Sequence, residues 1–498
     1  MEKEKHCWEQ VAINLGSHIQ VKSEDIINVS YQDLPFHLKP CFLYFGVFLE
    51  DEEIQVSKLT WLWTAEGLIK THKEKLSEDI AEYYLKNLIG RNLVMVSKKS
   101  SDGKTKACRI HDLLLDFCKK KAKVENFLQC IKGDNDMNPS SVSYQKRSIP
   151  RRLCLYFQGD NFAEWSSVCS DAQSFHLMKG RKIGISSIGH ASHIFNSFKY
   201  LRVLDLESIV IDSFPEALTC LRYVAARIAE DPSLSFSSNL WNLETLIVKG
   251  IGGRVSLPDT LWKMVKLCHL HIYNRAIFTI PNVQKLLKSP LKMDDLRTLA
   301  SAWFSCVEDA DNILAKTPNL QKLRCEVSRC DTFFPAFSNL TKLEMLKFSG
   351  GPFYDLENER NFPPSLKKLT LLNGRVLSLG QVATLPRLVV LKLLHVNFNP
   401  EPWEVTDEQF LHLKFLKLQD LSLSEWNVSD DAFPCLEHLV LRRLRYLVEI
   451  PSHFGDMLTL KSIEVITCNE SLAKSAKAIR ETQVEEMQNS DFKLFIQK

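Results

Sequence analysis

Apolar residues recur through the second half of the chain in one spacing, Leu-x-x-Leu-x-Leu with conservative replacements, from Leu201 to Val465. The first leucines recur at intervals of 18 to 30 residues, mostly 22 to 24. Each unit supplies one short strand, which is too small to bury its own apolar face and must stack on its neighbours. The clearest copies are Leu201/Leu204/Leu206, Leu243/Leu246/Val248, Leu267/Leu270/Ile272, Leu343/Leu346/Phe348, Leu366/Leu369/Leu371, Leu388/Leu391/Leu393, Leu418/Leu421/Leu423 and Leu436/Leu439/Leu441.

This period is typical of a leucine-rich repeat, and it predicts a curved α/β solenoid over residues 150–468. Arg152-Leu-Cys-Leu155 and Ser174-Phe-His-Leu177 are half-formed units, as the terminal units of solenoids tend to be. A solenoid presents a long concave surface of adjacent strands, so binding is the default expectation for this part of the chain.

Residues 29–130 follow a different pattern, which predicts an α-rich winged helix-turn-helix. Asp33-Leu-Pro35 precedes an apolar segment, two amphipathic segments follow it, and the pattern then changes to two short strands around Ser100-Ser-Asp-Gly103. The expected helices are Phe36–Leu49, Val56–Ile69, Leu76–Arg91 and a closing helix Asp112–Lys123, and the expected two-stranded wing is Leu93–Val96 with Ala107–Ile110.

The chain therefore divides into five parts. Residues 131–149 contain Gly133, Pro139 and several serine, asparagine and aspartate residues, which indicates a linker between the winged helix and the repeats. Residues 469–498 are charged and are expected to form a helical tail that shields the last repeat. Residues 1–28 precede the winged helix.

Composition narrows the class of protein only slightly. With 45% apolar residues, 25% charged residues and a formal charge of +3, the chain has no broad basic character. The helix that would enter a DNA groove carries Glu78, Asp79 and Glu82 against Lys86 and Arg91, so DNA binding is disfavoured. The charged segment Met1–Lys5 precedes no apolar signal core, and the longest strongly apolar run, Cys41–Leu49, is too short to span a membrane, so secretion and membrane insertion are not expected.

The cysteines show no Cys-x-x-Cys pair, which favours reduced thiols and the cytosol. Cys154, Cys268, Cys325 and Cys435 lie in or beside repeat strands, where a thiol packs as a small apolar group.

Motifs that resemble catalytic or ligand sites have simpler interpretations. Gly103-Lys104-Thr105 lacks the first glycine of a phosphate-binding loop, so a hairpin tip is expected. The glycines of Gly250-Ile-Gly252-Gly253 are expected in a repeat loop. The pairs His190/His193 and His269/His271 lack a third metal ligand nearby, and we interpret them as surface histidines. No set of catalytic residues stands out, so the chain is not expected to be an enzyme.

Arg109-Ile-His-Asp112 joins the expected wing to the closing helix. Taken alone, the motif is ordinary, because Asp112 can cap the helix and His111 can form a local hydrogen bond.

Four ordered features closely resemble one family. They are Ser30-Tyr-Gln-Asp-Leu-Pro-Phe-His-Leu-Lys-Pro-Cys-Phe-Leu-Tyr44, Leu62-Trp-Thr-Ala-Glu-Gly-Leu-Ile69, Ile110-His-Asp112 and the leucine-rich repeats. Together they resemble the second half of plant nucleotide-binding leucine-rich-repeat (NB-ARC, NLR) disease-resistance receptors, in particular the coiled-coil class of the late-blight-resistance type. Residues 1–28 look like the end of the helical NB-ARC subdomain that precedes the winged helix.

The resemblance implies a function. In the family, the histidine of a Met-His-Asp triplet contacts the phosphate of bound ADP and holds the receptor inactive. That role carries over to His111, supported by Asp112, with Ile110 in place of the methionine. The phosphate-binding loop and the magnesium-binding strand do not occur in this sequence. The chain therefore resembles a truncated receptor or a partial gene model, and we expect ADP or ATP binding only in a complete receptor.

The leading hypothesis is a cytoplasmic immune-receptor fragment. Its repeats would sense a pathogen effector or a guarded host protein, and its winged helix would pass the signal to an ADP/ATP switch that triggers the hypersensitive response. The alternative is a scaffold that binds a protein through its repeats without nucleotide. Nucleic acid is not an expected partner, and peripheral membrane association stays open.

A final pattern concerns charge on the repeats. The third and fifth positions of Leu-x-x-Leu-x-Leu face the concave side, and like charges there repel unless a partner offsets them. Two partners would offset these charges: an external acidic protein, or the chain's own acidic loop. We favour the loop. The basic positions are Lys322, Arg324, Lys347, Lys368 and Lys392, and the loop is Glu50, Asp51, Glu52 and Glu53.

Overall fold

The computed structural model describes residues 24–70, 76–132, 151–157, 171–179, 198, 200–211, 218–228, 239–256, 259–277, 292–329, 335–350, 362–376, 379–398 and 402–497. The chain divides into two compact units, Met1–Arg227 and Ile228–Lys498. The first contains the winged helix and the first repeats, and the second contains the other repeats.

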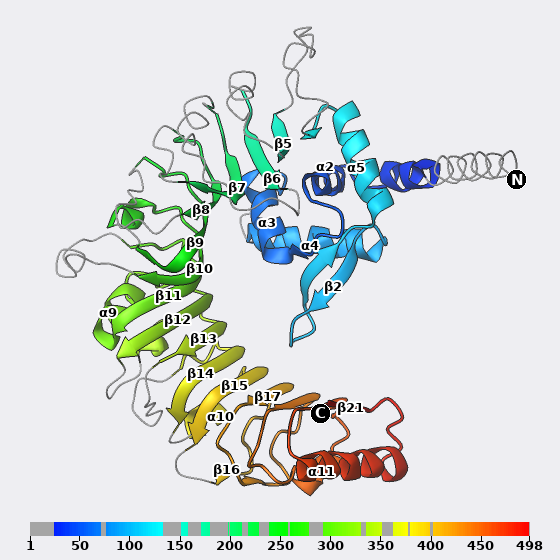
Figure 1. The fold of residues 1–498 in the computed structure, drawn as a ribbon, viewed down its shortest axis with the longest axis vertical. Coiled ribbons are helices and arrows are strands. Elements are labelled where there is room, and N and C mark those ends of the chain that lie inside the picture. The colour runs from blue at the N-terminus through cyan, green and yellow to red at the C-terminus, as the bar shows by residue number, and fades with distance from the viewer. Residues whose placement is uncertain are drawn as a thin grey trace, which may run out of the picture. The chain divides into compact units, whose positions relative to one another are not determined.

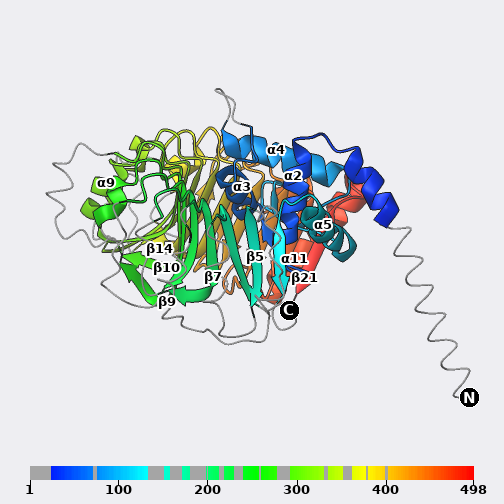
Figure 2. The same ribbon diagram turned by 90° about the horizontal axis from the view of Figure 1, so that it is seen from above.

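The helices of the first unit form a single cluster, which is clearest from above (Figure 2). After a helical segment at residues 24–32, they are α2 (Leu38–Leu43), the 3-10 helix η1 (Tyr44–Val47), α3 (Val56–Ala65), α4 (Ser77–Gly90) and α5 (Asp112–Val124). Their positions confirm the winged helix, although the first expected helix is shorter and tightens into η1.

The wing has three strands instead of the expected two. β3 (Thr105–Arg109) lies between β2 (Met95–Lys99) and β1 (Ile54–Gln55), and both pairings are antiparallel. Strand β1 was not expected because its two residues are too few to show the alternation of apolar and polar positions from which strands are predicted. At the hairpin tip Gly103 has a φ of +79°, so the interpretation of Gly103-Lys104-Thr105 as a turn is confirmed.

Helix α3 ends earlier than expected because of a glycine. Gly67 has a φ of +72°. Its N–H donates to Thr64 O, and the N–H of Leu68 donates to Trp63 O at 2.9 Å. These two bonds form a Schellman motif, in which a left-handed residue ends the helix and satisfies its last carbonyl groups.

The apolar run Cys41–Phe48 is buried at every position. On one side it packs into the winged helix, where the ring of Phe45 lies edge-on to Trp63 at 6.0 Å. On its other side the backbone carbonyls of η1 accept bonds from residues of the repeats, including Tyr156. The run therefore connects the winged helix to the repeats.

The repeat strands of the first unit are parallel, and they begin earlier than expected. β4 pairs with β5 at residues expected to end the winged helix and begin the linker. The rest of the expected linker, residues 133–149, lies outside the described part. The strands are β4 (Gln129–Lys132), β5 (Arg152–Phe157), β6 (Ser174–Lys179), β7 (Val203–Ile211) and β8 (Tyr223–Ile228).

The second unit is a curved parallel sheet with short helices on its outer side, as Figure 1 shows. Its strands are β9 (Thr245–Ser256), β10 (His269–Ile277), β11 (Thr298–Cys306), β12 (Lys322–Arg329), β13 (Met345–Ser349), β14 (Lys368–Val376), β15 (Val390–Phe398), β17 (Phe415–Gln419), β19 (His438–Arg442), β20 (Ser462–Ile466) and β21 (Lys493–Gln497). The outer helices are η2 (Asp259–Lys263), α9 (Val307–Leu314), η3 (Phe337–Asn339), α10 (Gly380–Ala383) and η4 (Ser452–Gly455).

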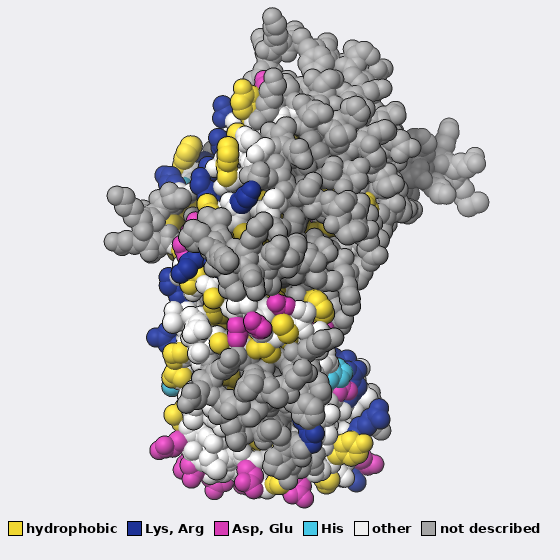
Figure 3. Space-filling model, turned by 90° about the vertical axis from the view of Figure 1, so that its left-hand side faces the viewer, with side chains coloured by type: hydrophobic (Ala, Val, Ile, Leu, Met, Phe, Trp, Pro, Cys, Tyr) yellow, Lys and Arg dark blue, Asp and Glu magenta, His cyan; other side chains and the backbone are white. Residues whose placement is uncertain are grey.

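Two short strands, β16 (Trp403–Val405) and β18 (Trp426–Val428), form a separate parallel sheet. The rings of Trp403 and Trp426 stack at 5.4 Å. Figure 3 shows the outer face, with acidic side chains along its lower end, where β16 lies in Figure 1. Exposed acidic residues of this region include Glu404, Asp407, Glu408, Glu425, Asp430 and Asp431.

The repeat that contains β17 uses a different frame from the expected one, Leu418/Leu421/Leu423. The sequence offers two overlapping patterns, Leu413/Leu416/Leu418 and Leu418/Leu421/Leu423, and strand β17 uses the first. With Leu413 as the first leucine, the neighbouring intervals from Leu388 and to Leu436 become 25 and 23 residues. The extreme intervals of 30 and 18 residues came from the wrong frame.

Two further expectations are wrong. The tail is helical only in part: α11 (Glu470–Glu481) and a π-helical turn (Thr482–Glu486) lead to β21, which pairs with β20 and extends the sheet. Gly250, Gly252 and Gly253 lie within β9 instead of in a loop.

Candidate functional site

The fifth position of the first repeats forms a row that touches the winged helix. The strand register places Cys130 opposite Cys154, Cys154 opposite His176, and His176 opposite Asp205. These side chains lie on the face opposite to that of the core leucines, because successive residues of a strand alternate between faces. We call these four residues the junction row.

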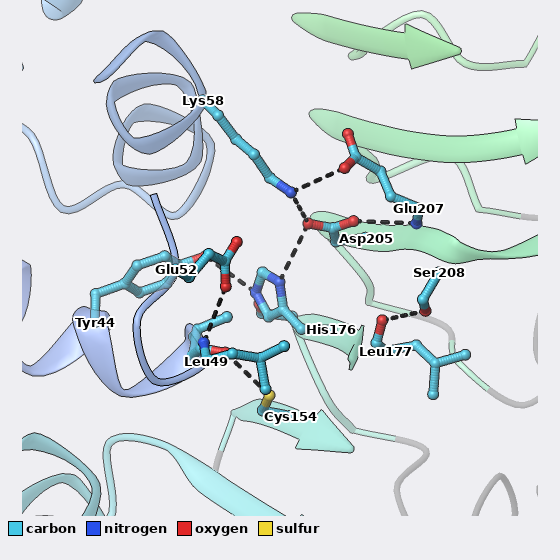
Figure 4. A network of polar contacts seen from close by, with 12 residues as sticks. Tyr44, Leu49, Glu52, Lys58, Cys154, His176, Leu177, Asp205, Glu207 and Ser208 are labelled. Carbon is cyan, nitrogen blue, oxygen red and sulfur yellow. Dashed lines mark hydrogen bonds and ion pairs between the residues drawn. The ribbon is translucent and has the colours of Figure 1, made fainter. Parts of the chain in front are cut away.

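Each residue of the junction row contacts the winged helix, and Figure 4 shows the centre of the arrangement. Cys130 Sγ donates to Gly46 O, and Cys154 Sγ donates to Val47 O, both at 3.5 Å. Tyr44 Oη and His176 Nε2 are 3.0 Å apart. Lys58 Nζ lies 2.8 Å from Asp205 Oδ2 and 3.3 Å from Glu207 Oε2.

The histidine of the junction row is neutral. His176 is fully buried, and burial lowers the pKa of its imidazole to about 4. Its Nε2 also lies 2.9 Å from Ser174 Oγ, while its Nδ1 is 4.0 Å from Asp205 Oδ2, too far for a hydrogen bond. A proton on both nitrogens would place a second charge beside Lys58 in a site without water access, so the neutral form is favoured.

The lysine of the junction is charged. Burial alone would lower the pKa of Lys58, but the charges of Asp205 and Glu207 outweigh it and raise that pKa above its usual value. Glu52, which accepts the N–H of Leu49, has its pKa raised by burial and lowered in part by Lys58. Since Asp205 is only 3% exposed, the ion pair with Lys58 has little solvent around it and depends on both partners.

A second ion pair strengthens the same interface. Arg152 Nε lies 2.8 Å from Glu66 Oε2, and the Arg152 guanidinium lies 4.3 Å from the centre of the Phe127 ring. Tyr156 Oη lies within 3.4 Å of the carbonyl oxygens of Gly46, Val47 and Phe48. The winged helix and the first repeats are thus joined by charged, polar and apolar contacts.

His111 caps the closing helix α5, contrary to the expectation that Asp112 does so. The N–H of Leu113 donates to His111 Nδ1 at 3.2 Å. Asp112 is instead the first residue of the helix, where the positive end of the helix dipole favours its charge. Ile110 is buried, whereas His111 and Asp112 are exposed.

The predicted basic positions occupy two rows of the second unit. One row contains Arg324, Lys347, Thr370, Lys392 and Lys417 in register, and we call it the basic row. Lys322 and Lys368 lie in the neighbouring row with Met345 between them. Lys417 was missed because the wrong frame moved it out of a fifth position. Burial, together with Arg442, lowers the pKa of Lys417.

The acidic loop is partly engaged within the first unit. Glu53 Oε1 lies 2.8 Å from Lys98 Nζ, and Glu52 is bonded to the backbone of Leu49. Glu50 and Asp51 are exposed. A contact between this loop and the basic positions stays a prediction.

The structure describes one of the two histidine pairs, His269 and His271, and this pair differs from the interpretation of these residues as surface histidines. His269 is 6% exposed and lies 3.2 Å from Thr298 Oγ1, and the ring of His271 stacks on Tyr273. His190 and His193 lie outside the described residues. Within the described residues, no group of three or more His, Cys, Asp or Glu side chains is arranged to hold a metal. No helix among them is long and apolar enough to cross a membrane.

Comparisons with known proteins agree with this architecture. Residues 47–118 match the model of the disease resistance protein winged helix domain, and residues 183–485 match that of a leucine-rich repeat region. The chain is similar over its whole length to two Solanum demissum proteins: putative late blight resistance protein homolog R1B-16, with 49% identity, and late blight resistance protein R1-A, with 46%. It spans 39% of each of these relatives.

Solved structures show a weaker likeness. The leucine-rich-repeat ectodomain of the receptor kinase GASSHO1/SCHENGEN3 from Arabidopsis thaliana has a TM-score of 0.43 and 19% identity, and the match covers 70% of this chain and 41% of that one. With a disease-resistance winged helix followed by repeats, and with relatives of this kind along its full length, the chain belongs to the leucine-rich-repeat disease-resistance proteins of the late-blight-resistance type.

Proposed function

We propose that the chain is the sensing and regulatory part of a cytoplasmic plant immune receptor. Its repeats bind a protein, either a pathogen effector or a host protein under surveillance, and its winged helix transmits that event to a nucleotide-controlled switch that starts the hypersensitive response. The identity of 46% to 49% with late blight resistance proteins over the whole chain supports this role. No disulfide joins the cysteines in the described part of the chain, and a reducing cytosol would keep them as thiols.

The observation that carries the proposal is the junction row. A signal that begins in the repeats must reach the winged helix through physical contacts with two possible arrangements. The contacts of Tyr44 with His176 at 3.0 Å and of Lys58 with Asp205 at 2.8 Å join the first repeats to the winged helix, and in this proposal the two parts move together. A displacement of those repeats would then displace His111, which belongs to the same compact unit.

His111 has the chemistry needed to contact a phosphate. Because its Nδ1 accepts the N–H of Leu113, the proton of the neutral ring lies on Nε2. The ring is exposed, so Nε2 can donate to a phosphate oxygen. Buried Ile110 fixes the backbone before the histidine, and Asp112 stabilises the helix that carries it. Nucleotide would bind here only together with a phosphate-binding loop, which this sequence does not contain.

The chain by itself is therefore proposed to hydrolyse no ATP and to bind ADP at best weakly, because one imidazole cannot neutralise a diphosphate. Joined to a nucleotide-binding domain, Asp112→Val should favour the active state by weakening the arrangement that holds ADP.

The basic row supports a partner with an acidic segment. Arg324 and Lys347 are direct neighbours on adjacent strands, as are Lys392 and Lys417, and an acidic segment bound along the row would reduce the repulsion between these like charges. Glu52 and Glu53 of the acidic loop already have partners in the first unit. This favours an external acidic protein over the internal loop as the occupant.

The test is a chimera that joins the upstream part of R1-A to this chain. We expect ADP to copurify with the chimera, and we expect Lys58→Asp to cause defence-related cell death in leaf tissue without a pathogen. A chimera that binds no nucleotide and whose activity ignores this substitution would instead favour a scaffold that works through the repeats alone.

A further inference from the structure

Two cysteines of the junction row lie side by side on adjacent strands. Cys130 on β4 and Cys154 on β5 are direct partners in the parallel register. Neighbouring strands are about 4.8 Å apart, and disulfides join residues whose Cα atoms are roughly 4.4 to 6.8 Å apart. Direct partners also point to the same face of a sheet. The backbone therefore already has a separation that a disulfide needs.

The two thiols share one environment beneath η1. Each donates to a carbonyl of η1, Cys130 to Gly46 and Cys154 to Val47. They differ in access, because Cys154 is fully buried and Cys130 is partly exposed. An oxidant from solvent would therefore reach Cys130 first.

We propose that Cys130 and Cys154 are a modification site at which a peroxide forms an intramolecular disulfide. The Cys130 thiolate attacks a peroxide oxygen, breaks the O–O bond and becomes a sulfenic acid. With hydrogen peroxide, the leaving hydroxide takes a proton and departs as water. The Cys154 sulfur then attacks the Cys130 sulfur and expels a second water. The peroxide gains the two electrons that the two thiols lose.

The disulfide has a consequence for the junction. Both S–H donors disappear, so the carbonyl groups of Gly46 and Val47 lose these partners on the repeats, and η1 is held less firmly. The contacts that bury Cys154 beneath η1 also limit the rate of the reaction. Burial raises the pKa of the Cys154 thiol well above its usual value, and the thiolate is the nucleophile. The closed junction therefore slows the second step, and an opened junction accelerates it.

The experiment treats the reduced full chain with hydrogen peroxide, blocks the remaining thiols under denaturing conditions and maps the peptides by mass spectrometry. The expected product is a peptide pair linked through Cys130 and Cys154. Its rate of formation should rise roughly tenfold per pH unit near neutrality, as the thiolate fraction does. Lys58→Met, which opens the junction, should accelerate it further.

Cys130→Ser and Cys154→Ser should each abolish the linked peptides. Cys118→Ser is the matched control, because that buried thiol also donates to a carbonyl, Phe42 O at 3.3 Å, but lies on helix α5 instead of a repeat strand. It should leave the link intact. Peptide mapping of the parent chain gives a result even if a serine variant folds poorly. The proposal is overturned if Cys130 oxidises to a sulfinic acid while Cys154 stays reduced, or if peroxide links other cysteines.

Discussion

The ammonium nitrogen of Lys58, on winged-helix α3, lies 2.8 Å from a carboxylate oxygen of Asp205, on repeat strand β7. Loss of Lys58 leaves the charge of Asp205 uncompensated in a site with little solvent, which costs about 3 kcal/mol or more. Loss of Asp205 should cost less, because Lys58 still has Glu207 at 3.3 Å. Lys58→Met and Asp205→Asn should therefore each lower the free energy of opening of the junction. The double variant should lose less than the sum of the two single losses.

Hydrogen exchange of peptides that cover η1 and β6 measures this opening in the full chain. Lys98→Met is the control, because it removes a lysine that also lies 2.8 Å from its carboxylate but is 59% exposed. Its effect should be much smaller, since solvent screens exposed pairs. If the losses in the free energy of opening add up exactly in the double variant, Lys58 and Asp205 act independently, which would contradict this prediction.

The neutral state of His176 predicts a pH dependence. Its pKa is about 4 in the folded chain and near 6.5 when unfolded, so between these values the unfolded state binds more protons. The stability of the junction is then fully present above pH 6.5 and falls as the pH drops toward 4, by at most about 3 kcal/mol. Glu52 acts in the opposite direction, because its folded pKa is raised by burial.

The histidine effect is expected between about pH 4 and 6.5, and a variant at His176 separates it from the opposite effect of Glu52. Hydrogen exchange of β6, corrected for the intrinsic rate, should show the loss of stability in the parent chain and a flatter profile in His176→Gln. The same slope in both proteins would assign the titration to another group.

His111 should contribute to ADP binding in the chimera with R1-A. A hydrogen bond to a charged group contributes about 1.5 to 3 kcal/mol, so His111→Ala should weaken ADP binding by roughly tenfold to a hundredfold. His111→Asn separates the two roles of the residue, because asparagine is a good helix cap but is shorter. It should preserve the stability of α5 and still weaken ADP binding. Calorimetry measures the affinity, and equal affinities in all three proteins would remove His111 from the site.

The basic row should bind acidic peptides. Lys347→Glu with Lys392→Glu reverses two positions of the row, whereas Lys342→Glu reverses an exposed lysine outside it. A fluorescent polyglutamate peptide should bind the parent chain and the Lys342 variant, bind the double variant far more weakly, and dissociate as salt screens the charges. Equal binding to the two variants would mean that the row does not recognise acidic partners.

The fold was largely predictable, because both parts of the chain have strong periodic patterns. The Leu-x-x-Leu-x-Leu spacing predicts strands such as β13 and β19, and the apolar positions of α4 predict that helix to within a residue of its ends. The errors have physical causes. Leu418 belongs to two overlapping frames that both satisfy the spacing within one repeat, and only the more even intervals to the neighbouring repeats favour the frame that begins at Leu413. Strand β21 follows a charged helix, and its pairing depends on β20 instead of on its own pattern.

The junction could not be predicted in the same way. His176 and Asp205 are polar residues at positions that normally face solvent, and a partner 132 residues away in the sequence buries the histidine against Tyr44. The available signal was weak: the fifth positions of the first repeats are Cys130, Cys154, His176 and Asp205, whereas those of strands β12 to β17 are basic except for Thr370. Side chains of this kind, on a strand face that is expected to contact solvent, indicate that another part of the protein covers that face. They do not identify the part that covers it.

The release of ADP from the chimera tests most directly whether the junction controls the switch. A fluorescent ADP analogue would be loaded onto the parent, Lys58→Asp, Asp205→Lys and the double variant, and its dissociation rate would be measured. Each single reversal places two like charges together and should accelerate release, whereas the double reversal restores an opposite pair and should return the rate close to that of the parent. If all four proteins release the analogue at one rate, the contact between the winged helix and the repeats does not control the nucleotide, and the account is wrong.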